Sequence, residues 1–318
     1  MVGAYKPLSG REFPRFSQNT SFFRLPQDTP EGPFEVALFG APFDGGASFR
    51  PGSRFAPGEV RRVSALGRAY NMGRQLNAFA AIACADVGDS PTSPTSIART
   101  HAQVEAFASS VISAGKRTLA VGGDHSLTLP LLRAWRKAVG EPLALVHFDA
   151  HFDTYPPAWD CPIHHGAFLK NAIEEGLVDP GRTVQIGIRG PLAGADDLDF
   201  VTKHALTVLT VEDVRERPFA EIAARLQVRG PAYLTYDVDC LDPAFAPGTG
   251  TPVPGGLTTY ETQKLLRALQ FERLVGADVM EVSPPYDVSD LTALAAVDAM
   301  FEAICLMAQS AGPALQPA

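Results

Sequence analysis

The chain has 318 residues, of which 46% are hydrophobic, and a formal net charge of −8 at pH 7. A chain of this length can bury a sizeable core, either in one large α/β domain or in two smaller ones. The acidic balance offers no basic surface for nucleic acid or for an anionic membrane, so neither is expected as a partner.

Short β-like runs alternate with helical patterns along most of the chain, which predicts a parallel sheet with helices on both faces. The expected strands are 35–39, 82–85, 118–121, 143–148, 183–188, 206–209, 233–238 and 274–280. The expected helices are 57–65, 96–114, 127–138, 166–176, 219–228, 259–269 and 291–311. No repeat, linker or low-complexity segment interrupts the pattern, so a single domain over 1–318 is predicted, with 1–33 as an N-terminal extension that packs on it.

The compartment is predicted from the first residues and the cysteines. The opening MVGAYKPLSGREFPRF contains charges and prolines where a secretory signal needs an apolar run, and apolar stretches such as 78–85 are too short to cross a bilayer. The four cysteines lie far apart without a CxxC pair, which favours reduced thiols in a cytoplasmic protein.

Acidic residues and a histidine recur at every second position after two of the predicted strands. Asp149, His151 and Asp153 follow one, and Asp237 and Asp239 end another. Alternate residues of an extended chain point the same way, so each set is expected to converge on one point. Ligands of parallel sheets collect at the carboxyl ends of the strands, which is where these residues fall.

A third strand end supplies Gly-Gly-Asp124-His125, which brings the number of potential metal ligands to six. A single Asp after a strand is ordinarily a helix cap or turn residue, but so many clustered acids would repel each other by several kcal/mol without a cation. Carboxylate and imidazole ligands suit Mn²⁺, Fe²⁺, Co²⁺, Ni²⁺ or Zn²⁺. Six ligands exceed one tetrahedral site, so two metals are predicted.

Several long segments, in order, resemble the signatures of the ureohydrolase (arginase/agmatinase) family: GGDHS, FDAHFDTY, DVDCLDPAFAPGTGTPVPGGL and EVSPPYD. PRF…FFRLP and GAPFDGGASFRPGSRFAPGEVRR resemble its agmatinase and guanidino-acid hydrolase branch. The resemblance extends from about Pro14 to Cys305. It implies a three-layer α/β/α sandwich around a mostly parallel sheet of about eight strands.

The resemblance also implies how the metals are held. One ion would be bound by His125, Asp149, Asp153 and Asp237, and the other by His151, Asp149, Asp237 and Asp239, with Asp149 and Asp237 bridging. Mn²⁺ is the expected metal and Ni²⁺ an alternative. Two cations roughly 3.5 Å apart share a water and bring its pKa toward neutrality. The bridging hydroxide would cleave a guanidino C–N bond and release urea, or a substituted urea, and an amine.

Three further residues receive roles from the resemblance. Glu281 would accept guanidinium N–H groups, for which a carboxylate is suited. His165, rather than its neighbour His164, would be the proton shuttle to the leaving amine. Thr251 would hydrogen-bond near the activated water, its alternative role being that of a turn residue. Asp124 is expected to orient a metal ligand.

The substrate is left open by the sequence. Gly190 stands where arginases hold the substrate amino group with an aspartate, which argues against L-arginine, and Tyr155 resembles agmatinases. Trp159 and Phe152 are expected to join Tyr155 in the pocket wall, and the segment 167–170 departs from the branch pattern. Agmatine, 4-guanidinobutyrate, 3-guanidinopropionate, and an alkylated guanidine or a biguanide such as metformin all remain candidates.

Two other classes of protein are weighed against the ureohydrolase. One is a deacetylase-like amidohydrolase of the same fold with a single Zn²⁺, and the other is a non-catalytic partner subunit of an active paralogue. The complete set of six ligands favours the two-metal enzyme over both. The resemblance further implies a homotrimer or homohexamer, with a hetero-oligomer containing a paralogue as the alternative.

Overall fold

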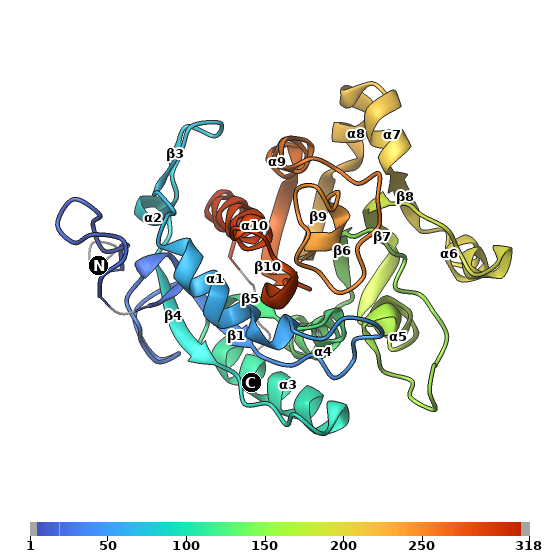
Figure 1. The fold of residues 1–318 in the computed structure, drawn as a ribbon, viewed down its shortest axis with the longest axis horizontal. Coiled ribbons are helices and arrows are strands. Elements are labelled where there is room, and N and C mark those ends of the chain that lie inside the picture. The colour runs from blue at the N-terminus through green and yellow to red at the C-terminus, as the bar shows by residue number, and fades with distance from the viewer. Residues whose placement is uncertain (1–4, 19, 313–318) are drawn as a thin grey trace.

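The computed structural model describes residues 5–18 and 20–312, and its centre is a parallel sheet of eight strands in the order β4-β1-β5-β10-β9-β6-β7-β8 (Figure 1). The strands are β1 Val36–Ala41, β4 Cys84–Asp89, β5 Arg117–Gly122, β6 Leu143–Phe148, β7 Val178–Ile188, β8 Thr207–Thr210, β9 Gln227–Asp237 and β10 Gln270–Met280. Every neighbouring pair is parallel. All eight predicted strands are confirmed.

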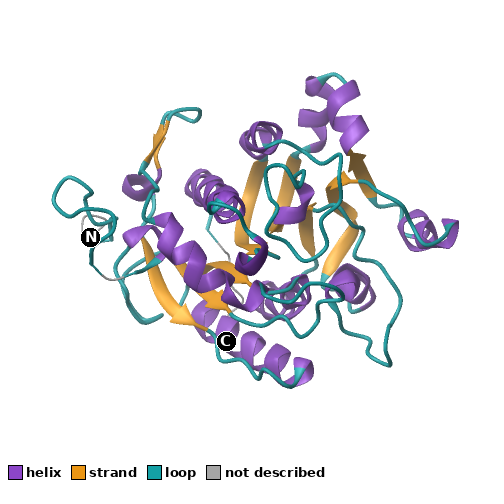
Figure 2. Cartoon of the chain, viewed as in Figure 1, coloured by secondary structure: helices purple, strands orange, loops and turns teal. Residues whose placement is uncertain are grey.

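Helices cover both faces of the sheet and complete a three-layer α/β/α sandwich, as predicted (Figure 2). They are α1 Ala56–Ser64, α2 Ala78–Ala81, α3 Ile97–Ser113, α4 Thr128–Val139, α5 Phe168–Glu174, α6 Asp199–Lys203, α7 Val211–Glu216, α8 Phe219–Arg225, α9 Thr259–Ala268 and α10 Leu291–Gln309. Helices α1, α9 and α10 share one hydrophobic core with the sheet, while α3, α4 and α5 share the core on its other face.

Strand β6 illustrates why these runs form a central sheet. Its sequence Leu-Ala-Leu-Val-His-Phe is buried throughout, because both faces of a parallel sheet are covered by helices. Side chains of a strand alternate between the faces. Val146 and Phe148 accordingly enter the core under α10, and Leu143 and Leu145 enter the core under α4.

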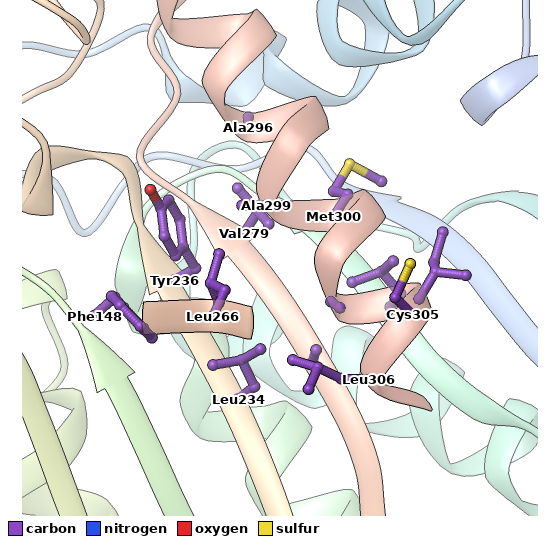
Figure 3. Packing of buried hydrophobic residues seen from close by; sticks show 14 of the residues in the cluster. Phe148, Leu234, Tyr236, Leu266, Val279, Ala296, Ala299, Met300, Cys305 and Leu306 are labelled. Carbon is purple, nitrogen blue, oxygen red and sulfur yellow. The ribbon is translucent and has the colours of Figure 1, made fainter. Parts of the chain in front are cut away.

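Helix α10 is long and apolar enough to cross a membrane by length and composition, with a mean hydropathy of 1.8. However, 72% of that stretch is buried within the fold. Figure 3 shows Ala296, Ala299 and Met300 of α10 close to Val279 of β10. Burial of this kind is that of a core helix in a packed domain.

The segment before β1 contacts the sheet and helix α1 through part of its described residues, while 10–16 are exposed. Phe22 and Phe23 are buried in the core beside α1, and the amide of Asp28 donates to the carbonyl of Asp86 in β4 at 3.1 Å. The four cysteines are all unpaired. Elements without a prediction are the short hairpin of β2 Tyr70–Asn71 and β3 Leu76–Asn77, and helices α2, α6 and α7.

Candidate metal centre and active site

Four neighbouring strands bring the predicted site residues together at one edge of the sheet. In sheet order these strands are β5, β10, β9 and β6. Their carboxyl ends are followed by the segments 124–125, 281, 237–239 and 149–153 respectively. Because the strands are parallel and adjacent, residues far apart in the sequence meet at a single place, as expected for this class of sheet.

The side chains converge, but the predicted reason for it is wrong. Strand β6 ends at Phe148, and Asp153 has a left-handed backbone with φ of +52°. Strand β9 ends at Asp237, where a 3-10 turn over Val238–Cys240 begins. The turns are held by carboxylates that accept amides two residues later, as Asp237 Oδ1 does from Asp239 at 2.8 Å. Tight turns, and not an extended chain, aim these groups inward.

The first group of side chains surrounds His125. Its Nδ1 lies 3.0 Å from Asp149 Oδ2, 3.0 Å from Asp237 Oδ2 and 3.3 Å from Asp153 Oδ2. Its Nε2 lies 2.8 Å from Thr235 Oγ1. Although it is buried, Nδ1 has no hydrogen-bond partner among the described residues. Three carboxylate oxygens around a nitrogen lone pair form a donor set that suits a divalent cation.

The second group is formed by His151, Asp149 and Asp239. His151 Nδ1 lies 3.3 Å from Asp149 Oδ1 and 3.1 Å from Asp239 Oδ2. Asp149 thus directs one oxygen to each group. Thr251 Oγ1 is 3.4 Å from Asp239 Oδ2, next to this group. The donor atoms fit two metal positions that share the Asp149 carboxylate.

Two acids of the first group have a strongly perturbed pKa. Burial, together with the charge of Asp149, raises the pKa of Asp153 well above its ordinary value. Burial and the charge of Asp239 do the same to the pKa of Asp237. The cluster therefore resists holding all its carboxylates ionised together, and a divalent cation would remove that repulsion.

His165 and Glu281 form a buried pair beside the metal groups. His165 Nδ1 lies 2.9 Å from Glu281 Oε1, and the same oxygen accepts the backbone amide of His125 at 2.9 Å. Glu281 has a left-handed φ of +64°, and its Oε2 is buried without a hydrogen-bond partner among the described residues. Burial favours the neutral imidazole, but the hydrogen bond and charge of Glu281 raise the pKa of His165 to about 9.

Ser48 completes the surroundings of His165, and nothing in the sequence pattern had assigned it a role. Its Oγ lies 2.7 Å from His165 Nε2, and its backbone amide lies 3.2 Å from the same nitrogen. Both ring nitrogens of His165 are therefore engaged. The neighbouring loop is held by Asp124, whose Oδ2 accepts the amide of Gly46 at 2.8 Å. Asp124 contacts this loop, and no bond joins it to the imidazole of His125.

Two buried polar residues lie behind the ligands. His147, which received no role from the sequence, has Nε2 2.8 Å from Asp149 Oδ2 and takes a hydrogen bond on Nδ1 from Gln185 at 3.1 Å. Thr235 donates to Asp278 Oδ1 at 2.5 Å, so its oxygen is an acceptor for Nε2–H of His125. That arrangement leaves the lone pair of His125 on Nδ1, facing the carboxylates.

A cavity of about 490 Å³ opens over these groups. Tyr155 and Trp159 line it, and Trp159 is 73% exposed at its mouth. Phe152 lies elsewhere: it is 7% exposed and packs in the core beneath the sheet, because the turn after β6 directs it inward. His164 is buried in the wall, with Nε2 3.1 Å from the carbonyl of Pro156.

Comparisons with known proteins find relatives over almost the whole chain. A model of the arginase family matches residues 34–306. Guanidinopropionase of Pseudomonas aeruginosa is 45% identical over 311 residues, which cover 96% of this chain and 97% of the relative. Agmatinase of Cronobacter sakazakii is 42% identical over 304 residues, covering 92% and 94%. The structure of proclavaminate amidinohydrolase from Streptomyces clavuligerus superposes with a TM-score of 0.89 at 40% identity, over 94% of this chain and all of that one.

Proposed function

Since the chain belongs to the arginase family, we propose that it is a two-metal hydrolase that cleaves a guanidino C–N bond and releases urea, or a substituted urea, and an amine. Its relatives are hydrolases of amidine C–N bonds, and this chain is a member of the same group of enzymes. The observation that supports the proposal most is the unpaired His125 Nδ1, which three carboxylate oxygens surround at 3.0 to 3.3 Å.

The metal ligands follow from the two groups of donor atoms. The first ion would be held by His125, Asp149, Asp153 and Asp237, whose oxygens surround His125 Nδ1. The second would be held by His151, Asp149 and Asp239, with Asp237 as a further ligand by resemblance to the family. Mn²⁺ is proposed, with Ni²⁺ as the alternative, because carboxylate and imidazole donors suit both. When bound, the pair supplies the Lewis acidity that activates water for attack on the guanidinium carbon.

His165 would protonate the leaving amine. It lines the cavity, and Glu281 both fixes its ring and raises its pKa to about 9, so that it holds a proton at neutral pH. Glu281 is buried behind His165, and its Oε2, which has no partner among the described residues, would accept a guanidinium N–H of the bound substrate. Thr251, which also lines the cavity, would hydrogen-bond near the activated water.

The substrate would be a small guanidino compound other than L-arginine. Gly190 has no side chain to hold an amino group, and a Cβ built there would meet Val253 Cγ1 at 2.8 Å, so a larger residue does not fit without a shift. Relatives named guanidinopropionase and agmatinase support guanidino compounds with short tails. The assembly is proposed to be a homotrimer or homohexamer, or a hetero-oligomer with a paralogue, which mass photometry measures directly.

A metal count combined with a urea assay tests the proposal. Protein loaded separately with Mn²⁺ and Ni²⁺ is dialysed, and its metal content is measured by mass spectrometry. The release of urea is followed with agmatine, 4-guanidinobutyrate, 3-guanidinopropionate and dimethylguanidine, and the release of urea or guanylurea with metformin. About two metals per chain and one of these products from at least one compound are expected.

The matched variants are Asp149→Asn and, on the exposed loop by the cavity mouth, Asp160→Asn. Asp149→Asn should lose metal and activity together, while Asp160→Asn should keep both. One Zn²⁺ per chain would instead support the deacetylase-like class, and two metals with no urea from any compound would support a partner subunit.

A further inference from the structure

The cavity has two chemically different ends. Its floor carries the metal groups together with Thr251 and His165. Its mouth is mostly apolar, with Pro156, Trp159 and Leu192 among its walls. When the guanidino group lies at the floor, the other end of the substrate, its tail, points toward the mouth. The side chains at the mouth take no part in the reaction, but they determine which tails bind.

Asp197 is the charged residue at that mouth. It belongs to the short 3-10 helix Ala195–Leu198 and is partly exposed. One of its oxygens, Oδ2, accepts the backbone amide of Ala193 at 2.9 Å, which fixes the carboxylate against a segment that also lines the cavity. Oδ1 has no hydrogen-bond partner among the described residues, so the group can meet a cationic tail.

The mouth offers no matching positive charge. Among the described residues that line the cavity, none is a lysine or an arginine. Arg189 is close in sequence to this wall, but its three guanidinium nitrogens all donate to backbone carbonyls, including those of Gly187 and Val253. Arg50 turns its guanidinium over the rings of Phe49 and Tyr286, at 5.5 and 5.0 Å from their centroids.

A carboxylate tail would thus lose hydration at the mouth, find no cation, and approach a carboxylate of the same sign. A positively charged tail would instead meet Asp197, and a neutral tail would rest on the apolar walls without a charge penalty. The similarity to guanidinopropionase alone would lead to the opposite expectation, since that relative is named for a substrate that ends in a carboxylate.

We propose that Asp197 makes this enzyme selective for guanidines with a cationic tail, with neutral alkyl tails tolerated and carboxylate tails disfavoured. The inference rests on the proposed function, because it assigns the far end of a substrate whose guanidino group reacts at the floor. Asp197 acts on the choice of substrate and takes no part in the chemical step.

Three substrates of similar length test it: agmatine, n-butylguanidine and 4-guanidinobutyrate, which differ mainly in the charge of the tail. For the unmodified protein, kcat/KM should fall in that order. Removal of a partly exposed charge should change kcat/KM by about fivefold for each charged substrate, downward for agmatine and upward for 4-guanidinobutyrate. Asp197→Asn should therefore lower the ratio of kcat/KM for agmatine to kcat/KM for 4-guanidinobutyrate by roughly twentyfold, mainly through KM. The kcat/KM for n-butylguanidine should change by less than about twofold.

Two variants are controls. Asp196→Asn alters the adjacent acid, which does not line the cavity, and should leave the ratio unchanged. Asp197→Glu keeps the charge and should keep this kcat/KM ratio within about threefold. It therefore distinguishes loss of the charge from a structural effect of replacing the residue. If the protein releases urea but prefers 4-guanidinobutyrate, or if the ratio is unchanged in Asp197→Asn, the role of Asp197 is overturned. Neither result contradicts the proposed hydrolase function. No urea from any of the three would overturn the role of Asp197, and two bound metals without cleavage of any compound in the wider panel would overturn the proposed function as well.

Discussion

His165 and Glu281, 116 residues apart in the sequence, are joined by a hydrogen bond of 2.9 Å between Nδ1 and Oε1. The same Glu281 oxygen accepts the amide of His125, whose side chain lies at the centre of the first metal group. One carboxylate oxygen therefore links the proposed proton donor to the backbone of a proposed metal ligand. Displacement of Glu281 would disturb both.

Replacing His165 should be far more damaging than replacing its neighbour. His165→Ala removes the proposed acid and should lower kcat by about 10² to 10⁴-fold, the usual range for general acid catalysis. His164→Gln changes a wall residue that bonds only the Pro156 carbonyl, and should lower kcat by less than about tenfold. Steady-state urea release from both variants, with metal content measured in parallel, makes the comparison. Equal losses would contradict the assignment of the donor.

The dependence of kcat on pH should report the protonation of His165 in its pair with Glu281. With a pKa of about 9, raised by Glu281 against the effect of burial, His165 is protonated below pH 9 and loses its proton above it. Since the protonated form is the donor, kcat should be maintained at neutral pH and fall as pH rises through about 9. Glu281→Gln removes the negative charge, so the alkaline limb should move to lower pH. A limb that stays in place in this variant would show that another group titrates.

Ser48 should affect His165 without affecting the metals. Ser48→Ala removes the hydroxyl at 2.7 Å from Nε2 but keeps the backbone amide, so a loss of about three- to tenfold in kcat is expected, with unchanged metal content. Ser48→Thr keeps the hydroxyl and should restore most of the rate. If Ser48→Thr is as impaired as Ser48→Ala, the hydroxyl is not the group that matters.

The pair of Thr235 and Asp278 should set how tightly the first metal is held. Thr235→Val is nearly isosteric and removes the hydroxyl between His125 Nε2 and Asp278, so metal affinity should fall by about 10 to 100-fold. His125 Nε2 and Asp278 Oδ1 would lose the hydroxyl as partner, which should also cost about 1–3 kcal/mol of unfolding free energy, although Asp278 Oδ2 keeps its bonds from Thr128 and Tyr233. Thr207→Val on the edge strand β8 is the control. Competition with a metallochromic chelator gives the affinity, and normal affinity in Thr235→Val would refute this support role.

The parts of the fold that could be predicted are those with a strong local signal. Strands such as β6 and β9 are buried on both faces and appear as apolar runs, and their acidic ends place the ligands at one edge of the sheet. The hairpin of β2 and β3 has only two residues per strand, too few for a periodic pattern. Helix α7 did have a signal, since Thr210 and Asp213 form a capping box.

The structure brings the predicted metal ligands together, but their local geometry could not be predicted from the sequence. The left-handed turn at Asp153 and the 3-10 turn after Asp237 depend on tertiary packing, so the extended-chain argument reached the correct cluster for the wrong reason. The same turn takes Phe152 out of the cavity. Ser48 meets His165 across 117 residues of sequence, and no short motif indicates such a contact.

Anomalous diffraction from crystals grown with Mn²⁺ would test the two-metal centre most directly. The expected result is two peaks roughly 3.5 Å apart, one at His125 Nδ1 and the other at His151 Nδ1, with one oxygen of Asp149 bound to each. A single peak, or two peaks that do not share Asp149, would contradict the proposed centre.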